Sequence, residues 1–140
     1  MFNYNTEMVS PDKWGPPLWY QMHMKTFAYP NNPSQKNKDD IRDFFRGIIN
    51  FLPCESCKEH YIEFLQKRPI RYQYDNKDKL IRWLIDLHNE VNARTGKRVL
   101  SYQEARSIYQ TQNGGGGSQM IIFLIILILL IICFQKLNKR

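Results

Sequence analysis

The sequence predicts an all-α protein, with a bundle of four helices and a short fifth helix followed by a single C-terminal transmembrane helix. Apolar residues recur at helical spacing through most of the chain, and no alternating strand pattern persists. Helix-capping and helix-breaking residues divide these runs into separate segments. A glycine-rich stretch then leads into an uncharged apolar run near the C-terminus.

The first two helices are expected over residues 11–28 and from Ser34 to Leu52. Tyr29-Pro30 ends the first, because the residue before a proline is biased away from helical geometry, and Ser34 can cap the second. Pro53 ends the second helix. The side chains expected to face inward are Trp14, Leu18, Trp19, Met22, His23 and Phe27 in the first helix, and Ile41, Phe44, Phe45, Ile48, Ile49 and Leu52 in the second.

Three further helices are expected after Pro53. The third opens at Cys54 and runs to about Lys67, where Arg68-Pro69 ends it. Asp75 is expected to cap the fourth, and Gly96 to end it. The inward residues of the fourth helix are Leu80, Ile81, Trp83, Leu84, Leu87, His88 and Val91. The last short helix begins at Ser101, which has capping-box spacing to Glu104, and runs to about Gln110.

The composition excludes some classes of function. The net charge is +7, but three of the 20 basic residues follow the apolar tail, where there are no acidic residues, so the excess elsewhere is mild. No run of Lys and Arg with interleaved aromatics marks a nucleic-acid path, so no nucleic-acid partner is expected. Three cysteines do not form a secreted disulfide framework, and the N-terminus has no apolar region typical of a signal peptide.

The C-terminal part is predicted to be a membrane anchor. Residues 113–119 form a glycine-rich linker, 120–135 the anchor and 136–140 a basic tail. The apolar stretch would span roughly 22 Å as a helix, and snorkelling of Lys136 can extend it. A buried helix is the alternative, but a helix apolar on every face needs a larger protein around it. Cys133 would then lie within the membrane without a catalytic role, or would be an acylation site.

The pair Cys54 and Cys57 is the first candidate for chemistry. At a helix N-terminus the macrodipole favours a thiolate, and Lys58 and His60 add positive character. The spacing lets the two sulfurs bond to each other, which suits thiol–disulfide exchange. A zinc site that recruits Cys54, Cys57, His60 and His88 is an alternative, as is a pair of buried spectator cysteines, and a lone CxxC motif does not decide between them.

A second group of candidate residues is polar and lies on the otherwise apolar inward face of the fourth helix. His88 and Asn92 are four residues apart and share a face, with Asn89 beside them. A lone histidine is most often a satisfied core residue, whereas a histidine with two amides suggests a polar, planar ligand. Flat rings and donors on two helices, with a dithiol at the start of a third, can surround an isoalloxazine and an adenine. The matching residues of the first helix are Trp14, Gly15, Trp19 and His23.

The sequence resembles the Erv/ALR family of FAD-linked sulfhydryl oxidases. The matching motifs occur in the order of the family, at similar intervals, over nearly all of residues 12–112. They are W-G-P-P-L-W-Y-Q-M-H at 14–23, A-Y-P at 28–30, C-E-S-C at 54–57, H-N-E-V-N at 88–92 and T-G-K at 95–97. The short chain also resembles the forms encoded by large DNA viruses.

The resemblance implies that residues 1–112 form a helical domain that holds FAD non-covalently, often as a homodimer. It implies that Cys57 lies against the flavin and that Cys54 meets the incoming thiol. Electrons would then pass through the flavin to oxygen and give hydrogen peroxide. The expected cofactor-binding residues are Trp14, Gly15, Trp19, His23, Cys57, His88, Asn89, Val91, Asn92, Lys97 and Tyr109, and no metal is expected.

The expected partners are thiol-containing proteins. Longer family members carry an additional shuttle cysteine pair, whereas Cys133 is alone here, so a small partner with its own CxxC motif is favoured as the shuttle. The basic residues after the anchor argue for a cytoplasmic C-terminal end. The N-terminal domain is also basic, however, and shows no signal peptide that would export it. A tail-anchored orientation is therefore expected, with the catalytic domain in the cytosol, on a viral membrane or a host endomembrane. Two other classes stay open: a zinc-stabilised, membrane-tethered helical adaptor without catalysis, and a structural bundle with spectator cysteines.

Overall fold

The computed structural model describes residues 10–113 and 125–127 of the 140-residue chain. The prediction of an all-α protein is confirmed for these residues, which contain no strand. The chain divides into two compact units, 1–105 and 106–140, and the bundle belongs to the first. The elements are α1 (Pro11–Phe27), α2 (Gln35–Phe51), α3 (Glu55–Lys67), the 3-10 turn η1 (Ile70–Tyr72), α4 (Lys77–Arg94) and α5 (Tyr102–Asn113).

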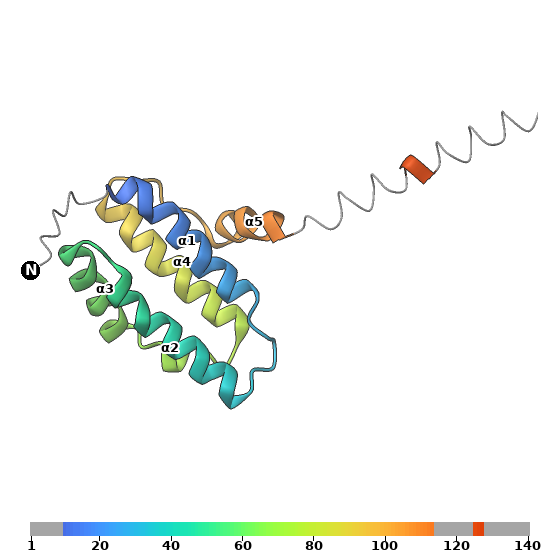
Figure 1. Cartoon of the computed structure of the whole chain (residues 1–140), viewed down its shortest axis with the longest axis horizontal. Coiled ribbons are helices and arrows are strands. Elements are labelled where there is room, and N and C mark those ends of the chain that lie inside the picture. The colour runs from blue at the N-terminus through green and yellow to red at the C-terminus, as the bar shows by residue number, and fades with distance from the viewer. Residues whose placement is uncertain (1–9, 114–124, 128–140) are drawn as a thin grey trace, which may run out of the picture. The chain divides into compact units, whose positions relative to one another are not determined.

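The first four helices run up and down in turn. Figure 1 shows α1 beside α4, and these two helices pack directly on each other, as do α2 and α3. One end of this bundle therefore holds the first turn of α1, the junction between α2 and α3, and the last turn of α4. This arrangement brings the predicted cysteine motif to the same end as the region that follows α4.

Capping residues set most helix boundaries where the sequence predicts them. At the start of α2, the Asn37 backbone N–H donates to Ser34 Oγ at 3.2 Å, and the Ser34 N–H donates to Asn37 Oδ1 at 3.0 Å. At the start of α5, Ser101 and Glu104 form the predicted reciprocal pair. Gly96 follows α4 with φ of 69°, which glycine adopts without strain.

The predicted cap of α4 is wrong by one residue. Asn76, not Asp75, caps the helix, since its Oδ1 accepts the Lys79 backbone N–H at 3.1 Å. Asp75 instead forms an ion pair with Lys38 of α2. Both side chains can cap a helix, so this choice depends on the tertiary contact with α2.

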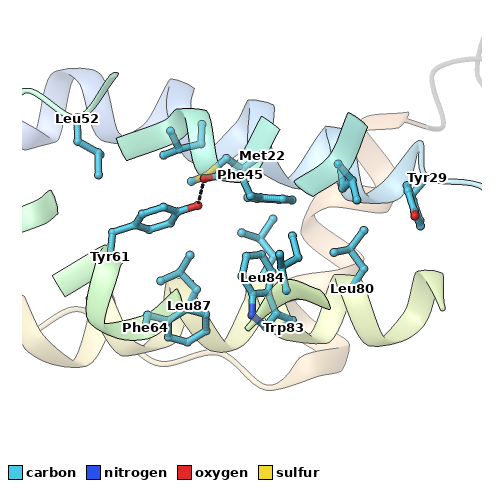
Figure 2. Close-up of a cluster of buried hydrophobic side chains, with 13 residues drawn as sticks. Met22, Tyr29, Phe45, Leu52, Tyr61, Phe64, Leu80, Trp83, Leu84 and Leu87 are labelled. Carbon is cyan, nitrogen blue, oxygen red and sulfur yellow. Dashed lines mark hydrogen bonds between the residues drawn. The ribbon is translucent and has the colours of Figure 1, made fainter. Parts of the chain in front are cut away.

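The core is centred on three aromatic rings from three helices (Figure 2). Phe45 of α2 meets Trp83 of α4 edge to face, with ring centroids 4.9 Å apart, and Phe64 of α3 lies 5.6 Å from Trp83 on the same measure. The Trp83 indole N–H donates to the Arg68 carbonyl at 2.8 Å, which satisfies its polar atom. The buried cluster also includes Met22, Tyr29, Ile41, Ile48, Leu52, Tyr61, Ile70, Leu80, Leu84 and Leu87.

The Tyr61 hydroxyl ties α3 to α2 inside this core. Tyr61 is 6% exposed, and its hydroxyl donates to the Phe45 carbonyl at 2.8 Å, the dashed line in Figure 2. Burial raises the pKa of Tyr61, so the hydroxyl keeps its proton and remains a donor. The contact fixes the position of α3 along the axis of α2, and therefore the position of the α2–α3 junction.

The predicted linker, anchor and basic tail lie outside the described residues, apart from 125–127. Cys133 lies outside them as well. Within the described ranges, no helix has both the length and the apolar character needed to cross a membrane.

Replacing Tyr61 by phenylalanine should lower the free energy of unfolding by about 1 to 2 kcal/mol, because it removes a buried hydrogen bond between α3 and α2. Urea unfolding followed by circular dichroism would measure the change. Tyr72 is 61% exposed, so Tyr72→Phe serves as the matched control and should change stability by less than about 0.5 kcal/mol. Equal effects of the two substitutions would show that the buried hydroxyl does not hold α3.

Candidate active site

The cysteine motif is built by the break between α2 and α3. Leu52 is extended, as expected for the residue before a proline, and Pro53 prevents α2 from continuing. Cys54 is the N-cap of α3, and its sulfur accepts the Cys57 backbone N–H at 3.3 Å. A disulfide joins Cys54 to Cys57, and both residues are half-buried. The prediction that Cys54 opens the third helix is confirmed.

The charges around the disulfide differ from the sequence expectation. Lys58 Nζ lies 3.0 Å from Glu55 Oε2, so a carboxylate in the first turn of α3 already matches the lysine charge. His60 is exposed on the same helix. Glu55 therefore offsets the charge of Lys58, and the two donors that reach Cys54, the Cys57 N–H and the Ser56 hydroxyl, are neutral.

A zinc site is not assembled in the part of the chain that the structure describes. No group of three or more His, Cys, Asp or Glu side chains there is placed to hold a metal ion. Cys54 and Cys57 are bonded to each other, and His60 faces solvent. These findings do not favour the zinc-stabilised adaptor, which needs Cys54, Cys57, His60 and His88 to converge.

The contact between α1 and α4 carries the second part of the site. The rings of Trp19 and His88 stack with centroids 3.9 Å apart and planes within 6°. His23 Nε2 lies 3.1 Å from His88 Nδ1 in a hydrogen bond, and His23 is fully buried. The structure thus brings together three residues predicted from two separate motifs. Because the Trp19 and His88 rings touch, a planar ligand would lie against this stack and not between the two rings.

Both histidines are held neutral. Burial lowers the pKa of His23 to about 3, with a smaller contribution from His88. Burial, followed by the positive charge of Lys97, lowers the pKa of His88 to about 4. At neutral pH one ring therefore donates its N–H to the lone pair of the other. A neutral pair of this kind suits an uncharged heterocycle that offers both donors and acceptors.

The two asparagines of the H-N-E-V-N motif hold the segment that follows α4. Asn89 Nδ2 donates to the Leu100 carbonyl at 2.8 Å, and Asn89 Oδ1 accepts the Leu100 N–H at 3.0 Å. Asn92 Nδ2 donates to the Arg98 carbonyl at 3.2 Å. These side chains thus fix the course of the backbone after α4. Their predicted contact with a cofactor stays a prediction.

The segment after α4 is also joined to the start of α1. Lys97 Nζ lies 2.9 Å from Asp12 Oδ1 in the first turn of α1. Asp12 carries no signal in the sequence that singles it out, because acidic residues are common in the first turn of any helix. Its partner, 85 positions away, becomes visible only in the folded chain. Together the two side chains connect α1 and α4 at the end of the bundle where the disulfide lies.

Two features near the start of α1 fit a bound group. The Trp14 Nε1 atom is buried and has no hydrogen-bond partner among the described residues. The backbone of Gly15 is buried, yet a Cβ placed there would meet no atom within 4 Å. Buried polar groups in native proteins normally have partners, so the unpaired Trp14 donor fits a ligand that supplies an acceptor, and the space at Gly15 fits a group that packs against the helix.

Two predicted cofactor-binding residues remain, Val91 and Tyr109. Val91 is half-buried on α4, and its carbonyl accepts the Thr95 hydroxyl at 2.9 Å. Tyr109 lies on α5, in the second unit of the chain. Their predicted contacts with a cofactor stay predictions.

Lowering the pH should destabilise the cofactor-free chain. An unfolded histidine titrates near pH 6.5, above the folded pKa values of about 3 for His23 and about 4 for His88. The stabilisation that the two neutral histidines contribute is therefore complete above about pH 6.5. It is lost as the pH falls toward the folded pKa values, because the unfolded state takes up protons. The free energy of unfolding should fall by roughly 2 to 4 kcal/mol between about pH 7 and about pH 5.

Urea unfolding across this pH range would measure the loss. His88→Gln should flatten the pH dependence, because one of the two depressed groups is gone. His60→Gln is the matched control at an exposed site and should keep the wild-type slope. A His88→Gln slope equal to that of the wild type would contradict the assignment.

Comparison with known proteins identifies the family of this chain. The model of the Erv1 / Alr family matches residues 16–111. A probable FAD-linked sulfhydryl oxidase of Acanthamoeba polyphaga mimivirus is 37% identical over 98 residues, which cover 69% of this chain and 68% of that protein. A putative FAD-linked sulfhydryl oxidase of Invertebrate iridescent virus 6 is 35% identical over 107 residues, which cover 73% and 96% of the two chains.

Solved structures show the same fold. The yeast Erv1 core superposes with a TM-score of 0.65 at 20% identity, and the match covers 76% of this chain and 91% of that one. The FAD binding domain of Erv1 from Saccharomyces cerevisiae gives 0.68 at 19% identity, with 74% and 96% covered. Since the family model covers more than half of the chain, and viral relatives share more than 30% of aligned residues, this chain belongs to the Erv1 / Alr family.

Proposed function

We propose that this protein is an FAD-dependent thiol oxidase that forms disulfide bonds in protein substrates. The observation that carries the proposal is the Cys54–Cys57 disulfide at the start of α3, in a chain of this family. The names of its relatives, FAD-linked sulfhydryl oxidases of several large DNA viruses, support it. A half-buried disulfide at a helix N-terminus is accessible to thiolates and has donors for the thiolate that forms.

The exchange proceeds in two steps. A substrate thiolate attacks the Cys54 sulfur, which breaks the bond to Cys57 and forms a mixed disulfide. A second substrate thiolate then attacks the substrate sulfur of that mixed disulfide, and Cys54 leaves as a thiolate. The substrate gains a disulfide and loses two electrons, which now reside on the Cys54/Cys57 dithiol.

The bound flavin would accept these two electrons and pass them to oxygen, giving hydrogen peroxide. The protein residues position the group. Trp19 and His88 offer a flat surface, the neutral pair of His23 and His88 offers a donor and an acceptor, and Trp14 offers an unpaired N–H. The remaining residues proposed to hold FAD are Gly15, Cys57, Asn89, Val91, Asn92, Lys97 and Tyr109.

The proposed partners follow from this activity and from the sequence. Thiol-bearing proteins are the substrates, and a small protein with its own CxxC motif is the proposed shuttle. A homodimer is proposed from the family resemblance. Residues 120–135 would tether the domain to a viral membrane or a host endomembrane, with the domain in the cytosol because it is basic and shows no signal peptide.

Purified wild-type protein should consume oxygen when dithiothreitol is added, and Cys54→Ser and Cys57→Ser should each abolish this activity. Either substitution removes the disulfide that receives the substrate electrons. An oxygen electrode would measure the rate, and a peroxide assay would identify the product. Cys133→Ser is the matched control and should retain the wild-type rate. Activity that survives in Cys54→Ser would refute the proposal.

Trp14→Phe should weaken FAD binding by about threefold to tenfold, since it keeps the ring but removes the unpaired N–H. Titration of the apoprotein with FAD, followed by flavin fluorescence, would measure the dissociation constant. Tyr20→Phe removes one polar atom from a partly exposed aromatic ring of the same helix and should leave the affinity unchanged. An unchanged affinity in Trp14→Phe would mean that this donor does not face the cofactor.

A further inference from the structure

The side chain of Ser56 lies beside the reactive disulfide. Its Oγ is 3.2 Å from Cys54 Sγ. A disulfide sulfur carries no proton, so the serine hydroxyl is the donor in this contact. The Cys57 N–H is a second donor to the same sulfur, at 3.3 Å. The geometry therefore directs two donors at Cys54.

Both of these donors are neutral, and the nearest basic side chain does not replace them. Lys58 is paired with Glu55 at 3.0 Å, so its charge is matched within the first turn of α3. A thiolate on Cys54 would depend on the helix N-terminus, the Cys57 N–H and the Ser56 hydroxyl. Of these three, only the hydroxyl belongs to a side chain that can be changed without altering the backbone.

We propose that the Ser56 hydroxyl stabilises Cys54 as the leaving thiolate when oxidised substrate departs. This inference rests on the thiol-oxidase function proposed above. In that step a substrate thiolate attacks the substrate sulfur of the mixed disulfide, a new sulfur–sulfur bond forms, and the bond to Cys54 breaks. The electron pair of the broken bond stays on Cys54, where the Ser56 hydroxyl donates to it.

The effect of Ser56 depends on the change in charge at the sulfur. A hydrogen bond to an ionised acceptor is roughly twice as strong as one between neutral groups. The hydroxyl therefore stabilises the reduced thiolate more than it stabilises the neutral disulfide. Removing it should shift the Cys54/Cys57 couple toward the disulfide, which is a lower reduction potential. Alanine is a good helix former, so Ser56→Ala should keep α3 intact.

The test compares the full-length holoprotein with Ser56→Ala and Ser56→Thr. Each protein is equilibrated without oxygen in mixtures of reduced and oxidised dithiothreitol near pH 8.5, where an ordinary thiol is about half ionised. The thiols are then alkylated, and mass spectrometry of the peptide that contains Cys54 and Cys57 gives the reduced fraction. The equilibrium constant should shift about threefold to tenfold toward the disulfide in Ser56→Ala. Ser56→Thr retains the hydroxyl and should stay close to the wild type.

Two results would overturn the inference: an unchanged equilibrium in Ser56→Ala, or an equal shift in Ser56→Ala and Ser56→Thr. The proposed function fails in a different way, through a wild-type protein that consumes no oxygen with dithiothreitol. The equilibrium measurement needs no oxygen. Failure of the inference and failure of the proposed function are therefore distinguishable.

Discussion

The site depends on how α1 packs against α4. Trp19 and His88 stack with parallel rings, and His23 bonds to His88 across the same contact. Successive residues on a helix are turned by about 100°, so a shift of either helix by one residue would separate these rings. The contact also lies in a buried region, where an imidazole must be neutral and hydrogen-bonded. Packing and polar satisfaction therefore select the same register for the two helices.

The other pair of helices, α2 and α3, positions the disulfide. Pro53 ends α2, and Cys54 immediately caps α3, so the disulfide sits at a fixed corner of the bundle. The hydrogen bond from the Tyr61 hydroxyl to the Phe45 carbonyl joins the two helices. Tyr61 lies about one helical turn after Cys57. The up-and-down order of the helices then brings this corner to the end of the bundle that also holds Asp12 and Lys97 (Figure 1). Because of this topology, the disulfide lies at the same end of the bundle as the junction between α1 and the segment after α4.

Neutral donors and acceptors dominate the site. His23 and His88 are uncharged at neutral pH, Trp14 offers an indole N–H, and Ser56 offers a hydroxyl to Cys54. The ion pairs at this end of the bundle lie on exposed or partly exposed side chains, where pairs contribute little to stability. Neutral groups suit a site that exchanges thiols for disulfides, because they stabilise a transient thiolate without holding it permanently.

The sequence by itself determined the helices, most of their caps and the identity of the two cysteines proposed to be reactive. Periodicity and capping are local properties, so Ser34, Ser101 and Gly96 could be assigned from their neighbours alone. Only the tertiary structure decided that Asn76 caps α4 in place of Asp75, that Asn89 and Asn92 hold the backbone after α4, and that Glu55 matches the charge of Lys58. In each of these cases several partners are compatible with the local sequence. The contact that forms is the one that the packing of distant segments brings within hydrogen-bonding distance.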